Sequence, residues 1–274
     1  MHSPVRKHYG SPEIVGRILA AVPWPDESGS PLTAASLFPY DQLHGRAIQA
    51  TREHAARLNP SAEAHLLDIG SGVGGPARYF ASTYGCRVTG IDVTPEFVAA
   101  SGELGRLCGL AGRVDFLEAD AAKLPFPAET FDHAYCFYVG MNLSDTAAVL
   151  SEVFRVLKPG ARLVWTEVTA LTGEPHFPLP WARTAEESHV GTVEQLTALF
   201  EDAGFALLAI EDETGSHVDL ARKIGASGQV PTAAEDQANH VVLGADFVER
   251  RKNYIRSLSE GLIASTLVVS MKPD

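Results

Sequence analysis

A short apolar strand that runs directly into a glycine-rich turn constrains the fold of this chain more than any other feature. Residues 66–75 read Leu-Leu-Asp-Ile-Gly-Ser-Gly-Val-Gly-Gly, and a helix is predicted to begin near Pro76. Glycine has no Cβ and tolerates positive φ, so such a turn lets bare backbone approach a nucleotide-like ligand. The run satisfies both G-x-G-x-x-G and G-x-G-x-G, and taken alone it does not say which nucleoside would bind.

Three further segments follow in an order that supports a nucleotide-binding sheet. Residues 87–92 read as a second strand that ends in Asp92, about 20 residues after the glycines, where the two hydroxyls of a ribose would lie. Residues 114–118 read as a third strand, followed by Asp120 and Ala121, and residues 130–135 as a fourth. A helix then runs up to Pro159-Gly160 and returns into a fifth strand. Strands that alternate with helices predict a parallel sheet with helices on both faces.

In these motifs the chain resembles the class I S-adenosylmethionine (SAM)-dependent methyltransferases, motif by motif over residues 61–170. Asp68 before the glycines, the Asp120-Ala121 pair and the Leu-Lys-Pro-Gly turn at 157–160 carry that resemblance. A closer resemblance is to the small-molecule branch that includes the sarcosine/dimethylglycine and ubiquinone-type methyltransferases. It rests on Asp-Gln-Leu-His at 41–44 with Ala-Thr-Arg-Glu at 50–53, Val-Gly-Met-Asn at 139–142, and the Pro-rich residues 175–182.

The resemblance implies an α/β fold, a Rossmann-like doubly wound seven-stranded sheet with an N-terminal helical lid. We expect three regions: the lid at 1–60, a SAM-binding Rossmann-like core at 61–170, and a substrate excursion with the C-terminal completion of the sheet at 171–274. Helices are expected at 12–19, 42–58 and 192–203, the last with Thr192 as its N-cap. A sixth strand is expected at 205–211, and a seventh, antiparallel strand at 262–271.

The resemblance also implies the cofactor, S-adenosyl-L-methionine, and the residues that bind it. The glycine loop would admit the methionine part, Asp92 with Val93 beside it the ribose, and Asp120 with Ala121 the adenine edge. Cys136 would contact the cofactor from beneath, and Tyr9 and Gln42 lie on segments that the relatives fold across the site. The expected cofactor residues are Gly70, Ser71, Gly72, Asp92, Val93, Asp120, Ala121, Cys136 and Gln42.

Three residues are candidates for the chemistry at the acceptor. Tyr138 would orient or deprotonate the acceptor, Glu167 would accept a proton or hold an N–H, and His176 is the general-base candidate by intrinsic pKa. Each also has a purely structural interpretation, as a half-buried strand tyrosine, a solvated loop acid and a packing histidine. Trp181 would wall an aromatic or cationic acceptor, or belong to the core.

The acceptor class follows from a departure from these relatives. Many of them carry a histidine just before Val-Gly-Met-Asn, where this chain has Tyr138. That difference speaks against a glycine derivative, and the added aromatic residues favour a larger, flatter acceptor. Because relatives of this branch methylate nitrogen or carbon atoms of specialised metabolites, including indole rings, the resemblance implies methyl transfer to a nitrogen or carbon of an aromatic, indole-like specialised metabolite. The alternatives are N-methylation of a small aliphatic amine, a non-catalytic SAM-fold binding module, and an NAD-dependent oxidoreductase.

Composition limits the partners. The 274 residues carry a formal net charge of −12, and no basic stripe appears, so nucleic acid is an unsuitable partner and a small-molecule acceptor is expected. No apolar run approaches a membrane span, and Met1 to Arg6 lacks a signal-peptide core, so a cytoplasmic protein is expected. The three cysteines lack C-x-x-C spacing and the ten histidines lack ligand spacing, so free thiols and no metal are expected.

Overall fold

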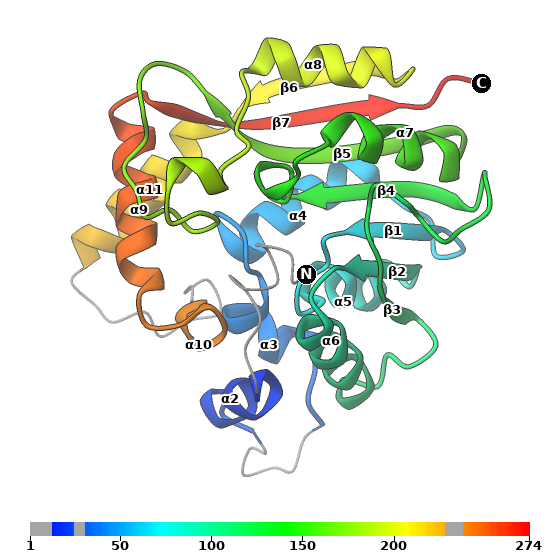
Figure 1. The fold of residues 1–274 in the computed structure, drawn as a ribbon. Helices are drawn as coiled ribbons and strands as arrows, with labels where there is room; N and C mark the ends of the chain where they lie inside the picture. Colours follow the sequence, from blue (N-terminus) through cyan, green and yellow to red (C-terminus); the bar gives the residue numbers. More distant parts are fainter. Residues whose placement is uncertain (1–12, 25–30, 228–237) are drawn as a thin grey trace. The chain divides into compact units, whose positions relative to one another are not determined.

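A seven-stranded mixed sheet organises the computed structural model, which describes residues 13–24, 31–227 and 238–274 (Figure 1). The strand order is β3-β2-β1-β4-β5-β7-β6. This confirms the predicted Rossmann-like α/β class with seven strands.

The chain divides into two compact units. One comprises residues 1–120 with 231–245, and the other comprises residues 121–230 with 246–274. The division into a lid at 1–60, a SAM-binding core at 61–170 and a substrate excursion with completion of the sheet at 171–274 stays a prediction.

The first unit is built on three parallel strands. They are β1 (His65–Ile69), β2 (Arg87–Asp92) and β3 (Val114–Glu118), as predicted. Residues 66–69 of β1 are buried, as expected for a parallel strand that is covered on both faces. Ile69 pairs with Ile91, so β1 and β2 end at the same edge and deliver their following residues there together.

Six helices are described in the first unit. They are α2 (Ile14–Ala21), α3 (Ala34–Asp41), α4 (Ala47–Leu58), α5 (Gly75–Tyr84), α6 (Pro95–Leu107) and α10 (His240–Leu243). The predicted helix at 42–58 is wrong at its start, and α3 was not expected. Arg46 and Ala47 adopt φ 58° and 44°, positive values that a regular right-handed helix does not contain, so the chain turns there and α4 does not extend back to Gln42.

A buried ion pair joins α3 to α5. The carboxylate Oδ2 of Asp41 accepts a hydrogen bond from Nη2 of Arg78 at 2.9 Å, and both side chains are completely buried. A Cβ added to Gly75, the first residue of α5, would collide with the backbone carbonyl of Asp41, so the two helices approach more closely than a side chain would allow. Charges held this deep depend on each other, because neither can return to water.

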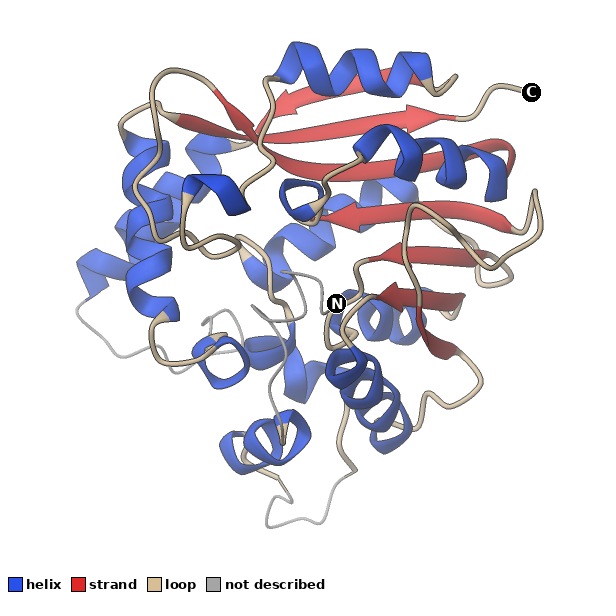
Figure 2. Ribbon diagram, viewed as in Figure 1, coloured by secondary structure: helices blue, strands red, loops and turns tan. Residues whose placement is uncertain are grey.

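The second unit carries the other four strands, which lie side by side in Figure 2. They are β4 (Phe131–Phe137), β5 (Leu157–Ala170), β6 (Ala206–Asp212) and β7 (Ile263–Met271). β4 and β5 are parallel, and β7 runs antiparallel to both β5 and β6. The prediction of an antiparallel last strand is confirmed.

The helices of the second unit were only partly expected. They are η1 (Gly140–Asn142), α7 (Thr146–Val156), η2 (Ala185–Glu187), α8 (Val193–Asp202), α9 (Thr214–Ser227) and α11 (Phe247–Ser259). The predicted N-cap at Thr192 is confirmed: its side chain accepts from the N–H of Gln195, whose side chain accepts in return from the N–H of Thr192. α9 and α11, which lie against each other in Figure 1, were not predicted.

The helix before β5 ends earlier than the sequence suggests. Pro159-Gly160 was expected to stop it, but α7 ends at Val156 and the next residue, Leu157, already pairs with Phe131 of β4. The ammonium of Lys272 donates hydrogen bonds to the carbonyls of Phe154 and Leu157, at 3.0 and 2.8 Å. A cation at a helix C-terminus satisfies carbonyls that have no partner in the helix.

None of the three cysteines, all of which lie in described residues, forms a disulfide. Burial raises the pKa of Cys86 and Cys108 to about 11, which keeps these thiols protonated and unreactive near neutral pH. Within the described ranges, no helix has the length and apolar character that a membrane crossing requires.

We predict that Asp41→Ala destabilises the protein strongly, because it leaves the guanidinium of Arg78 buried without its carboxylate. The expected loss in the free energy of unfolding is about 3–5 kcal/mol, measured by urea titration. Asp219→Ala is the matched control, because its partner Arg222 is exposed, and its loss should stay within about 1 kcal/mol. Equal losses in the two variants would contradict the assignment.

Candidate functional site

The loop after β1 brings glycine backbone to the edge where β2 ends. Gly70, Gly72 and Gly74 all adopt positive φ, at 70°, 52° and 79°. The N–H of Ser71 donates to the carbonyl of Ile91 at 2.9 Å, which fixes the start of the loop to β2. At Gly74 a Cβ would lie 2.6 Å from the ring of Phe116, so only glycine fits this conformation in this space.

The carboxylate of Asp92 is held by two backbone donors. Its Oδ2 accepts from the N–H of Gly72 at 2.9 Å, and its Oδ1 accepts from the N–H of Thr94 at 2.8 Å. Burial raises the pKa of Asp92, and these two hydrogen bonds oppose that rise. The structure thus brings together the glycine loop and the acid that the sequence placed 20 residues later.

The same loop contains a buried hydroxyl that suits a polar ligand. Ser71 is almost fully buried, and its Oγ has no hydrogen-bond partner among the residues that the structure describes. A buried polar atom without a partner is costly, and a ligand is one way to satisfy it. A carboxylate has about four lone-pair positions, so Asp92 keeps acceptor capacity after its two backbone bonds. These features fit a nucleoside with ribose hydroxyls.

The other cofactor candidates in the first unit lie in different surroundings. Val93 is partly buried beside Asp92, and Asp120 is exposed after β3. Tyr9 lies outside the described residues. Gln42 is completely buried at the end of α3, where its Nε2 donates to Oδ1 of Asp41 at 2.9 Å.

The amide of Gln42 takes part in a chain of buried polar contacts. Its Oε1 accepts from Oγ1 of Thr51 at 2.6 Å, and that hydroxyl lies 3.0 Å from Nε2 of His44. The chain reaches the Asp41–Arg78 ion pair through Asp41. Gln42 therefore supports the internal order of the first unit, and a direct role at the cofactor stays a prediction.

In the second unit, Ala121 and Cys136 are buried, with Cys136 inside β4. Their cofactor contacts likewise stay predictions.

Glu167 is a buried carboxyl group on β5. Its Oε1 accepts from the backbone N–H of Met141 at 3.1 Å and of Val168 at 2.9 Å, and its Oε2 accepts from Nε1 of Trp165 at 3.3 Å. Burial raises the pKa of Glu167 to about 8, against the lowering effect of these donors. Glu167 is therefore not a solvated loop acid, and that interpretation is wrong. Its raised pKa lets it hold or release a proton near neutral pH.

The Val-Gly-Met-Asn turn is shaped by this carboxyl group. A Cβ on Gly140 would collide with Oε2 of Glu167, and the indole of Trp165 lies just beyond. Gly140 is thus needed for the close approach of η1 to β5. The glycine of the Val-Gly-Met-Asn motif at 139–142 is therefore explained by local packing.

Tyr138 follows β4 in a strained conformation, with φ 57°. Positive φ is a genuine outlier for a bulky residue, so surrounding contacts must hold it. Its N–H donates to the carbonyl of Thr166 at 3.0 Å. Its hydroxyl lies 2.8 Å from Nε2 of His217 and 2.6 Å from Oγ of Ser265.

Sequence reasoning missed His217 and Ser265. They lie 79 and 127 residues after Tyr138 and belong to α9 and β7. No motif surrounds either residue, and α9 was not predicted. The one available signal was the correct placement of the seventh strand, which carries Ser265.

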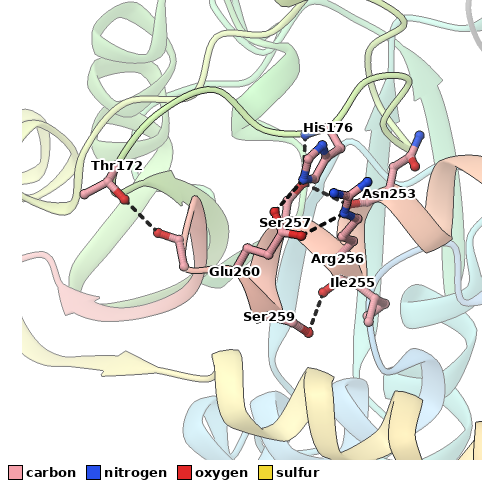
Figure 3. A network of polar contacts seen from close by, with 9 residues as sticks. Thr172, His176, Asn253, Ile255, Arg256, Ser257, Ser259 and Glu260 are labelled. Carbon is pink, nitrogen blue, oxygen red and sulfur yellow. Dashed lines mark hydrogen bonds and ion pairs between the residues drawn. The ribbon is translucent and has the colours of Figure 1, made fainter.

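His176 is held by α11, as Figure 3 shows. Its Nε2 lies 2.6 Å from Oε2 of Glu260, and its backbone N–H donates to Oγ of Ser257 at 2.9 Å. Nε of Arg256 donates to the other oxygen of Glu260 at 2.8 Å. These contacts tie His176 to α11 and the residue that follows it, and its role as a general base stays a prediction.

Trp181 lies in an apolar cluster of the second unit. Its ring meets that of Tyr254 edge to face at 5.8 Å, and Phe177 and Tyr138 pack against the same cluster. Its indole N–H donates to Oγ of Ser188 at 3.0 Å. The aromatic residues of the Pro-rich segment therefore gather with Tyr138 in one part of the second unit.

Comparisons with known proteins match this chain to methyltransferases. Residues 67–165 match the family model described as a methyltransferase domain. O-methyltransferase resE of Aspergillus sclerotiorum is 35% identical over 59% of this chain and 62% of its own length. Methyltransferase GfsG of Streptomyces halstedii is 32% identical over 69% of this chain and 66% of its own length. The chain spans about three fifths of the length of the former relative.

A solved structure matches almost the whole chain. It is described as the [4+2]-cyclase SpnF, with a TM-score of 0.68, 24% identity, and coverage of 97% of this chain and 98% of its own. At this identity the likeness shows the fold alone.

We predict that the proton on Glu167 makes stability depend on pH. The folded protein keeps this proton up to about pH 8, whereas the unfolded chain releases it above about pH 4.5. Unfolding therefore releases a proton in that window, so this group lowers the free energy of unfolding as pH rises.

Glu167→Gln removes the titration, so the stability of the variant relative to the parent should rise with pH between about 5 and 8, by up to roughly 1.4 kcal/mol per unit. Urea titrations at several pH values measure this difference. A difference that is independent of pH would contradict the raised pKa.

Proposed function

This chain belongs to the class I SAM-dependent methyltransferases, and we propose that it transfers the methyl group of SAM to a small-molecule acceptor. The observation that carries the proposal is the Asp92 carboxylate held on the glycine loop, within the segment that matches the methyltransferase model. A fold by itself does not fix a reaction, so the site has to carry the assignment.

The first unit offers the groups that a SAM nucleoside needs. We propose that Asp92 accepts hydrogen bonds from the ribose hydroxyls and that Ser71 and the glycine backbone contact the methionine part. Once bound, SAM supplies a methyl group already activated on a sulfonium. The enzyme then has to hold a nucleophilic atom in line with that methyl group and exclude water.

We propose that the acceptor is aromatic and indole-like and that a nitrogen or carbon atom receives the methyl group. The support is the aromatic character of the second unit, where Trp181, Tyr254 and Phe177 gather with Tyr138. Flat apolar side chains suit a flat acceptor through stacking and edge contacts. The O-methyltransferase name of one relative makes a hydroxyl oxygen a competing target.

An acceptor panel tests this proposal. The protein is incubated with SAM that carries a labelled methyl group and with tryptamine, indole, a naphthol or sarcosine. We expect label in the indole compounds, and NMR of the product identifies the methylated atom.

The other outcomes separate the alternatives. Turnover of sarcosine alone would replace the aromatic acceptor by an aliphatic amine, and turnover of the naphthol alone would replace nitrogen and carbon by oxygen. Binding of S-adenosylhomocysteine without transfer to any compound would favour a non-catalytic module.

We predict that Asp92→Ala weakens the binding of S-adenosylhomocysteine by about 1–3 kcal/mol, because a charged acceptor of two hydroxyl groups is lost. Isothermal calorimetry measures the dissociation constant. Asp92→Asn keeps one acceptor oxygen and should lose less.

Asp115→Ala, on the exposed face of β3, is the control and should bind like the parent. An unchanged dissociation constant for Asp92→Ala would remove this residue from the site. Binding of NADH in place of S-adenosylhomocysteine would favour the oxidoreductase.

A further inference from the structure

Three hydroxyl-bearing side chains of the second unit surround the ring of His217, and the four residues come from four segments. Its Nε2 lies 2.8 Å from the hydroxyl of Tyr138 and 3.1 Å from Oγ of Ser265, and its Nδ1 lies 3.4 Å from the hydroxyl of Tyr254. The residues come from the end of β4, from α9, β7 and α11. Both nitrogens of the imidazole are therefore within reach of a hydroxyl group.

The positions of these groups are fixed from several sides. His217, Ser265 and Tyr254 are buried, and the ring of His217 meets those of Tyr138 and Tyr254 edge to face, each at 5.8 Å. Ser265 is itself held, because its N–H donates to Oγ1 of Thr214 at 3.0 Å. Such a network rigidifies the groups it contains.

Tyr138 differs from the other three residues, because it is only partly buried and its backbone is strained. Strained backbone persists where the surroundings over-determine it, and it clusters at functional sites. The contacts of its phenol with His217 and Ser265 are among those that hold this backbone. Tyr138 is also the most exposed of the four residues, so it is the member of the network that an acceptor would meet.

We infer that His217 is a positioning residue that takes up, through Tyr138, the proton that the acceptor loses on methylation. This inference rests on the proposed methyl transfer and deepens it. The S–CH3 bond breaks with its electron pair left on sulfur, and the acceptor atom forms the new bond to carbon. The proton of that acceptor atom passes to the oxygen of Tyr138 while the phenol proton passes to Nε2 of His217.

The relay defines the class of acceptor. The methylated atom must carry a proton, as in an O–H, an N–H or an electron-rich aromatic C–H group. A tertiary amine or a thioether has no such proton and would gain nothing from the relay. Imidazole is suited to the final step, because its ordinary pKa lies close to neutral pH.

His217→Gln separates proton uptake from packing. The amide can accept a hydrogen bond from the Tyr138 hydroxyl near the position of Nε2, but it does not take up a proton at neutral pH. We expect kcat on the best acceptor of the panel to fall roughly 100-fold or more, as for loss of a general base, with KM changed by less than about 3-fold.

Tyr138→Phe should cause a similar loss. The double variant should be no slower than the slower single variant, because the two residues act as a unit. His189→Gln, an exposed histidine of the same unit, is the matched control and should keep the parental kcat. Binding of S-adenosylhomocysteine should be unchanged in all of these variants.

A His217→Gln variant that keeps more than about a third of the parental kcat, or losses that multiply in the double variant, would overturn the relay while leaving methyl transfer intact. Lack of turnover by the parent protein on every acceptor would instead overturn the proposed function. In that case the NMR shifts of the ring nitrogens of His217 still test the contact between Tyr138 and His217 on which the relay depends. These shifts should change in Tyr138→Phe, and unchanged shifts would overturn the relay.

Discussion

The hydrogen bond from the backbone N–H of Gly72 to the carboxylate of Asp92 is the contact on which the candidate cofactor site depends. It needs β1 and β2 to be parallel and in register, so that both end at the same edge. It also needs positive φ in the loop, which glycine adopts without steric cost. When these conditions hold, the carboxylate of Asp92 and the buried hydroxyl of Ser71 both lie at the glycine loop.

The parts of the fold that depend on short-range patterns could be predicted from the sequence. One example is the stretch from the apolar run at 66–69 through the glycines to the acid that ends β2. Each of these features is recognised from residues close to it in the sequence. The capping box at Thr192 is equally local, because its two partners lie three residues apart. The antiparallel seventh strand was found through the family resemblance rather than through its own pattern.

The parts that depend on distant partners could not be predicted. Arg78 meets Asp41 across 37 residues, and Tyr138 meets Ser265 across 127. The sequence around each of these residues contains no pattern that predicts its distant partner. The break between α3 and α4 was missed because Arg46, rather than a glycine or proline, takes the left-handed conformation there. Glu167 was identified as a candidate, but its burial and raised pKa depend on tertiary packing around β5, including that of η1.

The place of β7 between β5 and β6 has a consequence for how the second unit assembles. β6 forms its ladder with β7, although β7 begins about 50 residues later in the chain. Until β7 has paired with β5, β6 lacks the strand with which its backbone groups form hydrogen bonds. The packing surface for α8, which contacts β6, is then also incomplete. Closure over such a long stretch of chain is entropically costly, so we expect this half of the sheet to be the late, slow step of assembly.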